Sequence, residues 1–422
     1  MSLSVKVVKF STGERFAHLI DSETLLPHFE STIYNIAMLR GRQLATATIE
    51  QALRAIKIFL LFCDMRGISL STRMQKGFLF QEGELDHLLR LCRMPMEHLD
   101  AMAAAVKIGG VACSPKRLQL IPSAKSDAEV SGHHIMNRII YIREYVDYLA
   151  SIQCDRFVQD HENYLLLSDQ RKTAYNKLTA SLPKDKGRNV VNQRMGLDEE
   201  EQQTLWKFVD PNYSGNVWVG RHCRARNELM TRMFVKLGIR RGELAGISVR
   251  DIDFRARRIL IRRRADDKKD PRPSQPNAKT TDRYLPLSDD LLQRIQRYVA
   301  GERKAQAKAS SHPFLFVANG GRPLGLRAVN KVFEVLAKRC GEFAELYPHL
   351  FRHTFNENLS TNLDAKQVPP AEEEPIRSEL NGWKPSSGTA ATYTKRTIQR
   401  RAREASLELQ GKQPAKPIIN DE

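Results

Sequence analysis

The sequence lacks the features that mark membrane, secreted and zinc-binding proteins. It contains no run of about 18 apolar residues, so no segment is expected to span a bilayer. Its first ten residues alternate valine with lysine and lack the apolar core of a signal peptide. The six cysteines are scattered, without a C-x-x-C pair, and we expect free, mostly buried thiols rather than a zinc site. These absences favour a cytoplasmic protein.

Wholesale disorder is excluded by composition. Hydrophobic residues make up 41% of the chain and charged residues 27%, both typical of globular proteins. The length of 422 residues suits two or three domains. No internal repeat or low-complexity tract is present, so we expect separate globular domains.

The charge is strongly unbalanced. Lys and Arg number 67 against 49 Asp and Glu, a net charge of +18, which favours nucleic acid or an anionic membrane surface as partner. Up to residue 192 there are 25 basic and 20 acidic residues (+5), and from residue 193 onward 42 and 29 (+13). Basic residues cluster at 221–226, 255–264 and 395–403. Each cluster alone equally fits a solvated face, but together they indicate a surface that follows phosphates.

The first part of the chain has helical periodicity. Apolar residues recur at helical spacing over 46–63 and 135–152, and Gly67 is expected to end the first of these helices. Further elements are expected as helices over 84–92, 98–108 and 159–180, and as a short strand over 5–10. We therefore expect an N-terminal extension (1–30), a helical domain (31–182) and a polar linker (183–194).

The second part, residues 195–405, combines helices with short strands, and residues 406–422 form a tail. Asp198 is a predicted N-cap with acidic residues in the turn that follows it. The alternation of apolar and basic residues over 258–263 predicts an edge or half-exposed strand, and a second strand is expected over 283–287. Helices are expected over 199–209, 224–237, 289–309, 326–340 and 349–362.

Four short segments of this second part carry side chains suited to phosphoryl transfer. A helix over 349–362 would place His349 and Arg352 on one face, where both can reach one ligand. Arginine forks onto phosphate, fixed cations can offset charge without a metal, and a tyrosine hydroxyl can form a covalent intermediate. Each feature alone is weak, because most H-x-x-R pairs are structural and few tyrosines are nucleophiles. The segments are GIRRGEL (238–244), KTTDRYLPL (279–287), HLFRHTF (349–355) and LNGW (380–383) with TYT (392–394).

In this order the segments resemble the tyrosine recombinase (phage integrase) family, which includes Cre, the Xer recombinases and lambda integrase. The resemblance covers about residues 195–405. Family members carry Arg, Lys, His-x-x-Arg, His or Trp, and Tyr, and the matching residues here are Arg240, Lys279, His349, Arg352, Trp383 and Tyr393.

Three departures from the family pattern stand out. The interval from Trp383 to Tyr393 is one residue longer than the commonest spacing, and the segment 362–376 is longer and more acidic than in compact members. A Pro-rich loop also precedes Lys279, and both extra segments are expected as loop insertions. Alternatives to Lys279 are Lys268, Lys269 and Arg283, and the rival tyrosines, expected to be packing residues, are Tyr284, Tyr298 and Tyr347.

The resemblance implies a fold and a reaction. The fold is mainly α with a small β-sheet in the catalytic domain, arranged as a two-domain DNA clamp of a helical core-binding domain (31–182) and a catalytic domain (195–405). The implied reaction is site-specific cutting and rejoining of DNA, in which Tyr393 forms a 3′-phosphotyrosyl link and releases a 5′-hydroxyl. No metal, ATP or other cofactor is implied.

Each matched residue has an implied role in that reaction. Arg240 and Arg352 hold the non-bridging oxygens, and Lys279 protonates the leaving oxygen. His349 hydrogen-bonds the phosphate or helps move the tyrosine proton. Trp383 donates one hydrogen bond or buttresses the site. Glu243 orients the cations, or is simply part of a salt bridge.

The implied partner is double-stranded DNA with a specific recombination site. The family works as a homotetramer on DNA through a Holliday junction, and we expect a monomer or weak oligomer in free solution, with accessory DNA-bending proteins as further partners. The implied setting is the cytoplasm, in association with the nucleoid, of a prokaryote or of a cell that carries the phage or other mobile element. The basic helix expected over 397–409 is either a solvated end or an arm that docks on a neighbouring subunit or on DNA.

Three alternatives stay open. The first is a DNA-binding protein of the same fold that no longer recombines, which the filled catalytic positions disfavour. The second is a type IB-like topoisomerase, which His349 disfavours because those enzymes usually have lysine there. A structural RNA-binding module is the most distant.

Overall fold

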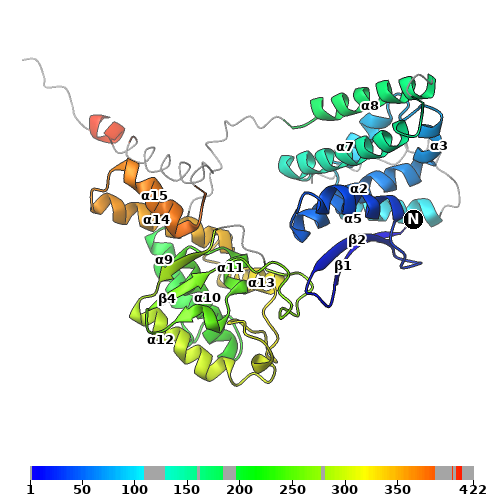
Figure 1. Ribbon diagram of the computed structural model, residues 1–422. Coiled ribbons are helices and arrows are strands. Elements are labelled where there is room, and N and C mark those ends of the chain that lie inside the picture. Colours follow the sequence, from blue (N-terminus) through cyan, green and yellow to red (C-terminus); the bar gives the residue numbers. More distant parts are fainter. Residues whose placement is uncertain are drawn as a thin grey trace, which may run out of the picture. The chain divides into compact units, whose positions relative to one another are not determined.

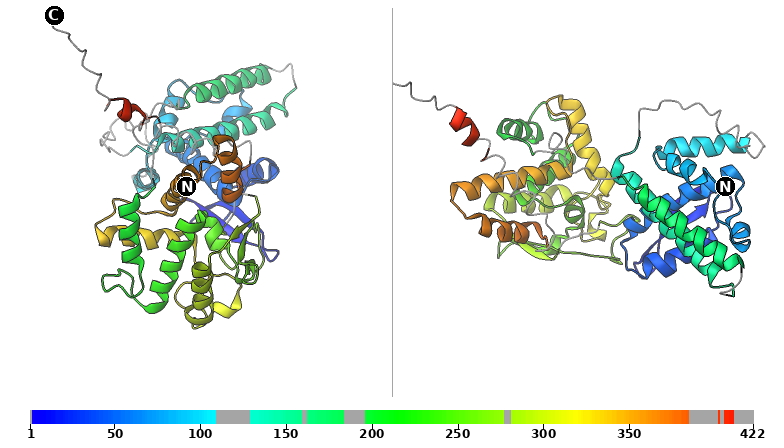
Figure 2. Two further views of the ribbon diagram at one scale, coloured as in Figure 1. Left: turned by 90° about the vertical axis from the view of Figure 1, so that its left-hand side faces the viewer. Right: turned by 90° about the horizontal axis from the view of Figure 1, so that it is seen from above.

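The computed structural model describes residues 2–108, 129–158, 162–183, 196–276, 281–384, 402 and 405–410. The chain divides into two compact units, Met1–Asn189 and Val190–Glu422. Figure 1 shows the elements of both units, and Figure 2 gives two further views. Each unit has its own hydrophobic core and is described by itself.

The first unit begins with a β-hairpin. Strand β1 (Leu3–Lys9) pairs antiparallel with β2 (Arg15–Asp21). Alternate residues of β2, Ala17 and Leu19, are buried in the same core as the helices that follow. The sequence predicted the first strand and missed the second, because β2 has no run of β-branched residues. These residues therefore pack with the helices of the unit, although the sequence suggested an extension.

Helix α2 (Thr46–Arg66) is central in the first unit. It is buried along most of its length, through residues such as Ile56 and Phe59, and it ends at Gly67 in the left-handed conformation (φ +63°), as predicted. Helix α7 packs on α2, and α8 packs on α7 (Figure 1). Among its described residues, the unit contains the helices α1 (Phe29–Tyr34), α2, α3 (Leu70–Gln75), α4 (Glu84–Leu91), α5 (Met96–Ile108), α7 (Gly132–Cys154) and α8 (Glu162–Ala180), with a π-helical turn, η1 (Asn35–Arg40), after α1.

The second unit combines helices with a three-stranded antiparallel sheet of order β3-β4-β5. Its first half contains α9 (Glu199–Val209), α10 (Arg221–Leu237), α11 (Arg241–Gly246), η2 (Val249–Asp251), β3 (Ile252–Asp253), β4 (Arg258–Ile261) and β5 (Arg283–Pro286). Its second half contains α12 (Asp289–Tyr298), η3 (Val299–Arg303), η4 (Ala309–Ser311), α13 (Leu326–Cys340), α14 (Pro348–Ala365) and α15 (Pro370–Asn381). The mainly helical fold with small sheets agrees with the predicted fold class.

Aromatic packing joins three of these helices. The ring of Phe234 on α10 lies 5.7 Å from that of Phe333 on α13, which lies 4.8 Å from that of Phe351 on α14. All three side chains are fully buried. Because Phe351 precedes Arg352, this packing fixes the face of α14 that carries the predicted site residues.

Two local predictions for the second unit were wrong, and a third was confirmed only in part. Strand β4 is half-exposed, which is one of the two predicted alternatives, but it is the middle strand of the sheet rather than an edge, because the short strand β3, which was not predicted, pairs with its other side. The helix expected over 289–309 becomes a π-helical turn at Val299 and ends at Arg303. Residues 362–376 are not a loop insertion, because α14 runs to Ala365 and α15 begins at Pro370. Proline suits a first helical turn, and acidic residues there favour helix formation.

The cysteines are free where the structure describes them. Cys63, Cys92 and Cys154 are buried, Cys223 and Cys340 are partly exposed, and Cys113 lies outside the described residues. Burial raises the pKa of the Cys63 and Cys92 thiols to about 12. Within the described ranges, no three His, Cys, Asp or Glu residues are grouped closely enough to hold a metal ion. The same ranges contain no helix with the length and apolarity needed to cross a membrane.

Candidate functional site

The turn between α10 and α11 positions Arg240. Helix α10 ends at Gly238, which has φ +60°, and a Cβ atom there would lie 2.2 Å from Cδ1 of Phe355 on α14. Glycine thus permits both the turn and the close approach of the chain to α14. Arg240 then caps α11, and its backbone N–H donates to Glu243 Oε2 at 2.9 Å.

A buried carboxylate holds two arginines from different elements. The Glu243 side chain is fully buried. Arg283 of β5 donates from Nη1 to Oε1 at 3.3 Å and from Nη2 to Oε2 at 3.0 Å, and Arg240 Nη1 lies 3.4 Å from Oε1. Paired charge-assisted hydrogen bonds of this kind fix direction as well as distance. Glu243 therefore forms a buried salt bridge with Arg283 and also contacts the Arg240 side chain.

Arg283 is occupied by this structural pairing. Its side chain is 2% exposed, and its Nε donates to the Leu380 carbonyl at 2.9 Å. An arginine guanidinium keeps its proton in proteins, so Arg283 is a poor alternative to Lys279 as a proton donor.

Arg352 lies on α14 and is 1% exposed. Its Nη1 donates to the Gly238 carbonyl at 2.5 Å, and its Nη2 donates to the Asn381 carbonyl at 3.0 Å. Arg240 Nη1 donates to the same Asn381 oxygen at 3.3 Å. Two predicted phosphate-binding arginines thus converge on one main-chain oxygen at the end of α15.

His349 is exposed in the first turn of α14. The helix begins at Pro348, so His349 and Arg352 share one helix, as the sequence predicted. The His349 ring lies 4.7 Å from that of His353, at an interplanar angle of 74°. This ring contact holds His349 at the same end of α14 as Arg352.

Trp383 follows the C-terminal cap of α15. Gly382 has φ +64°, and the N–H groups of Gly382 and Trp383 donate to the Glu379 and Ser378 carbonyls at 3.3 and 3.0 Å. The Trp383 side chain is buried, with its ring centroid 5.2 Å from Cζ of Arg352. A guanidinium at this distance from an indole face is held by a cation–π interaction.

Two predicted residues, Lys279 and Tyr393, lie outside the described residues, as does most of the segment 397–409. Among the rival tyrosines, Tyr298 is buried against His222, and burial raises its pKa to about 12. Tyr347 is partly buried and precedes α14. Tyr284 is 54% exposed, with Cζ of Arg258 4.2 Å from its ring centroid, so it does not pack in the core.

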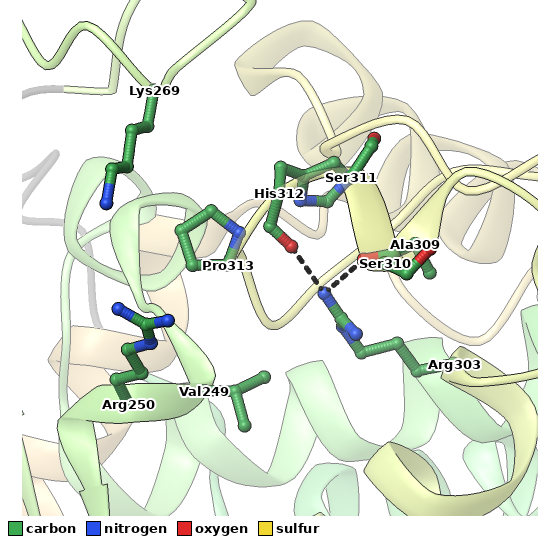
Figure 3. A pocket seen from close by; sticks show the side chains of 9 residues that line it. All are labelled: Val249, Arg250, Lys269, Arg303, Ala309, Ser310, Ser311, His312 and Pro313. Atoms are coloured by element: carbon green, nitrogen blue, oxygen red, sulfur yellow. Dashed lines mark hydrogen bonds between the residues drawn. The ribbon is translucent and has the colours of Figure 1, made fainter.

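A separate pocket of about 410 Å³ contains none of the matched motif residues. Figure 3 shows Lys269 and Arg250 on one side of Pro313 and Arg303 on the other. Arg303 Nη2 is occupied by the carbonyls of Ala309, at 2.8 Å, and His312, at 3.0 Å. Lys269, an alternative to Lys279, thus lines this pocket, which is separate from the convergence of Arg240 and Arg352.

The sequence indicated Glu243 as a residue that contacts the cations, but it did not indicate the connecting contacts of Asn381 and Arg283. Asn381 belongs to the LNGW segment, but the sequence does not single it out. It accepts hydrogen bonds from the two arginines through its main-chain oxygen, and every residue type has such an oxygen. Arg283 could have been found, because period-two alternation places it on the same strand face as the buried Leu285.

Comparison with known proteins agrees with the motifs. Residues 196–400 match the model of the phage integrase family. Over 161 residues the chain is 27% identical to tyrosine recombinase XerC of Staphylococcus aureus, a match that covers 38% of this chain and 46% of the relative. The chain thus spans about half the length of the curated relatives that it matches.

Solved structures of recombinases are also similar. A XerH site-specific recombinase in a post-cleavage complex with palindromic difH substrate superposes with a TM-score of 0.40 and 14% identity, covering 85% of this chain and 96% of that one. A lambda integrase dimer bound to a COC′ core site gives a TM-score of 0.35 and 14% identity, covering 92% and 94%.

Proposed function

We propose that this chain, which belongs through residues 196–400 to the phage integrase family of tyrosine recombinases, cuts and rejoins duplex DNA at a specific site. The observation that carries the proposal is the convergence of Arg240 and Arg352 on the Asn381 carbonyl, with Trp383 against Arg352. These residues come from three separate parts of the sequence and follow the order of the family's motifs.

The proposed reaction is a transesterification. The Tyr393 hydroxyl attacks the scissile phosphorus, a P–O bond to tyrosine forms, and the bond to the 5′ oxygen breaks. The leaving oxygen takes a proton from Lys279 and departs as a hydroxyl. The phosphotyrosyl link preserves the bond energy, so rejoining is the same reaction in reverse and no ATP is consumed.

The two arginines supply the electrostatic part of catalysis. Arg240 and Arg352 neutralise the charge that builds on the non-bridging oxygens in the pentacoordinate transition state. Glu243 holds Arg240 at the correct angle, and the Trp383 ring supports Arg352. His349 hydrogen-bonds the phosphate or accepts the tyrosine proton.

The proposed partner is duplex DNA, which the +13 charge of the second half of the sequence would attract through its phosphates. We propose residues 31–182 as the core-binding domain, 183–194 as linker, 195–405 as catalytic domain and 406–422 as tail. Strand exchange would take place in a homotetramer through a Holliday junction, in the nucleoid, with accessory DNA-bending proteins. The segment 397–409 would dock on a neighbouring subunit or on DNA.

A nicked suicide substrate tests the proposed reaction. Cleavage near the nick releases a short fragment, so the covalent protein–DNA adduct accumulates. The substrate is built from the repeats that flank the gene of this chain. The wild-type chain is expected to form the adduct, and Tyr393→Phe is expected to bind the same DNA without forming it, because the hydroxyl nucleophile is gone.

Tyr284→Phe is the matched control and is expected to keep full adduct formation, because it removes an exposed tyrosine hydroxyl from the same unit. An adduct that persists in Tyr393→Phe would refute the proposed nucleophile. Binding without any wild-type adduct would favour a non-recombining DNA-binding protein. Relaxation of supercoiled plasmids that lack the repeats would favour a topoisomerase.

A further inference from the structure

We infer that Asn381 is a positioning residue that fixes Arg240 and Arg352 relative to each other, and that a buried polar network on α14 and α15 holds Asn381 in place. The inference rests on the proposed function, because it assigns those arginines to the scissile phosphate. It adds residues that have no counterpart among the matched motif residues.

The first step of the argument is the end of α15. Carbonyls in the last turn of a helix lack partners within the helix, and they carry its partial negative charge. Here the Asn381 oxygen accepts from Arg240 and Arg352, and the Leu380 oxygen accepts from Arg283. One helix end thus binds three arginines from three elements.

The second step is the side chain of Asn381, which forms a reciprocal amide pair with Asn356 of α14. Asn381 Nδ2 donates to Asn356 Oδ1 at 3.0 Å, and Asn356 Nδ2 donates to Asn381 Oδ1 at 3.2 Å. Asn356 Nδ2 also donates to the carbonyl of Arg352 at 2.8 Å. Both amides are fully buried, so the pair ties the α15 acceptor directly to the turn of α14 that carries Arg352.

The third step is the charge behind this pair. Arg377 is fully buried, and its Nε donates to Glu373 Oε1 at 2.9 Å. Its Nη1 donates to the Asn356 carbonyl at 3.0 Å, and its Nη2 donates to Ser360 Oγ. Removing one member of such a pair leaves an uncompensated buried charge, so loss of either partner is strongly destabilising. Glu373 lies in the acidic segment 362–376, which thereby gains a role.

The arrangement differs from ordinary helix packing. Two helices that only need to pack can use apolar side chains, which place no requirement on hydrogen-bond direction.

Asn358, two residues further along α14, is an asparagine of the same helix whose hydrogen bonds do not reach the arginines. Its side chain exchanges hydrogen bonds with Gln202 at the exposed surface, at 2.9 and 3.3 Å, and touches neither arginine. It therefore serves as the matched control.

The test compares two suicide substrates at saturating DNA, one with a normal scissile phosphate and one with a methylphosphonate there. The methylphosphonate has a methyl group in place of one non-bridging oxygen and carries no negative charge, so its cleavage depends less on two correctly placed arginines. For Asn381→Ala we expect phosphodiester cleavage to fall roughly 10- to 100-fold, the scale of a misplaced catalytic group, with methylphosphonate cleavage much less affected. Asn358→Ala is expected to leave both rates unchanged.

The ratio of the two rates separates positioning from folding. A variant that is merely less stable loses both rates in proportion, and an unchanged ratio for Asn381→Ala overturns the inference. If that variant does not fold, judged by thermal unfolding, Asn356→Ser removes the amide donor to the Arg352 carbonyl and must change the ratio in the same direction. Failure of the proposed function is distinguishable, because the wild-type chain would then form no Tyr393-dependent adduct on either substrate.

Discussion

Each unit of the molecule contains a buried glutamate held by two arginine nitrogens, and the two sites differ in what they connect. In the first unit, Glu84 accepts from Arg73 at 2.6 and 3.1 Å and from the backbone N–H of Gln81 at 2.8 Å. In the second unit, Glu243 accepts from Arg283 at 3.3 and 3.0 Å and also contacts Arg240. The chemistry of the two carboxylates is the same.

Their networks extend over very different distances along the chain. The Glu84 network connects only residues that are near one another in sequence. Arg66, which also pairs with Glu84, donates to His87 at 3.1 Å, and Arg73 donates to the Leu79 carbonyl at 3.2 Å. The Glu243 network crosses the second unit through carbonyls of α15, which lie 97 and 141 positions from Arg283 and Arg240 in sequence. A local network stabilises one loop, whereas the long-range network fixes the relative positions of separate elements.

The pKa of Glu84 agrees with a stabilising role. Burial acts to raise this pKa, but the hydrogen bonds from Arg73 and Gln81 and the nearby arginine charges outweigh burial and lower it. The ionised form is thus the one that the fold prefers. In the second unit the network ends instead at Arg240, whose side chain is 29% exposed and can meet a ligand.

The sharpest test of this contrast exchanges one arginine in each unit for lysine. Lysine cannot span two carbonyls and a phosphate at once. Arg352→Lys is expected to lower single-turnover cleavage by about 10²- to 10³-fold, the usual loss for one transition-state donor, with DNA binding retained. Arg73→Lys is expected to lower the thermal unfolding temperature and leave cleavage at saturating DNA unchanged. Equal cleavage losses in both variants would contradict the assignment of a stabilising role to Arg73 and a catalytic role to Arg352.

The carboxylates themselves give a second comparison. Glu84→Gln and Glu243→Gln each leave a guanidinium facing a neutral amide. Loss of one member of a buried pair lowers the free energy of unfolding by about 3–5 kcal/mol. The larger loss is expected for Glu243→Gln, because Arg283 is 2% exposed and Arg73 is 21% exposed. Hydrogen exchange resolved by unit measures both losses, and only Glu243→Gln should also slow cleavage. A larger loss of unfolding free energy in Glu84→Gln than in Glu243→Gln would show that the burial of the partner arginine does not determine the size of the loss.

The smallest expected effect concerns acid sensitivity. Burial, followed by the charges of Arg66 and Arg90, lowers the pKa of His87 to about 4. An unfolded histidine titrates near 6.5, so between about pH 6.5 and 4 the unfolded chain binds more protons than the native chain. The free energy of unfolding of the first unit should therefore fall as the pH drops through this window.

His87→Gln removes the titrating group and should flatten this dependence in hydrogen exchange of the first unit. The second unit serves as internal control, because its exchange should be unaffected by the substitution. A pH profile of the first unit that is identical in the variant and the wild-type chain would show that His87 does not control it.

The sequence predicted best what local periodicity and composition determine. Helix α13 has the predicted bounds, α2 ends at Gly67, and Asp198 caps α9, whose Glu201 N–H lies 2.8 Å from Asp198 Oδ1. These features depend on side chains a few positions apart. The sequence also placed Arg240, Arg352 and Trp383 in separate motifs, and the structure brings these three side chains together.

Long-range pairings were not predictable in the same way. Strand β2 depends on β1 and on the core beneath it, and β4 is central only because β3 pairs with it. Acidic residues and prolines suggested a loop over 362–376, yet Glu373 is 3% exposed because Arg377 compensates its charge within α15. An ion pair of this kind allows a charged residue to be buried, although the same residue taken alone would be expected at the surface.

The end of α15 also determines how the candidate site can fail. Because one helical turn accepts from Arg240, Arg283 and Arg352, a displacement of that turn breaks three charge-assisted hydrogen bonds in a single event. The three arginines are therefore expected to lose their positions together rather than one at a time. The docking of one short helix thus sets the geometry of the whole candidate site.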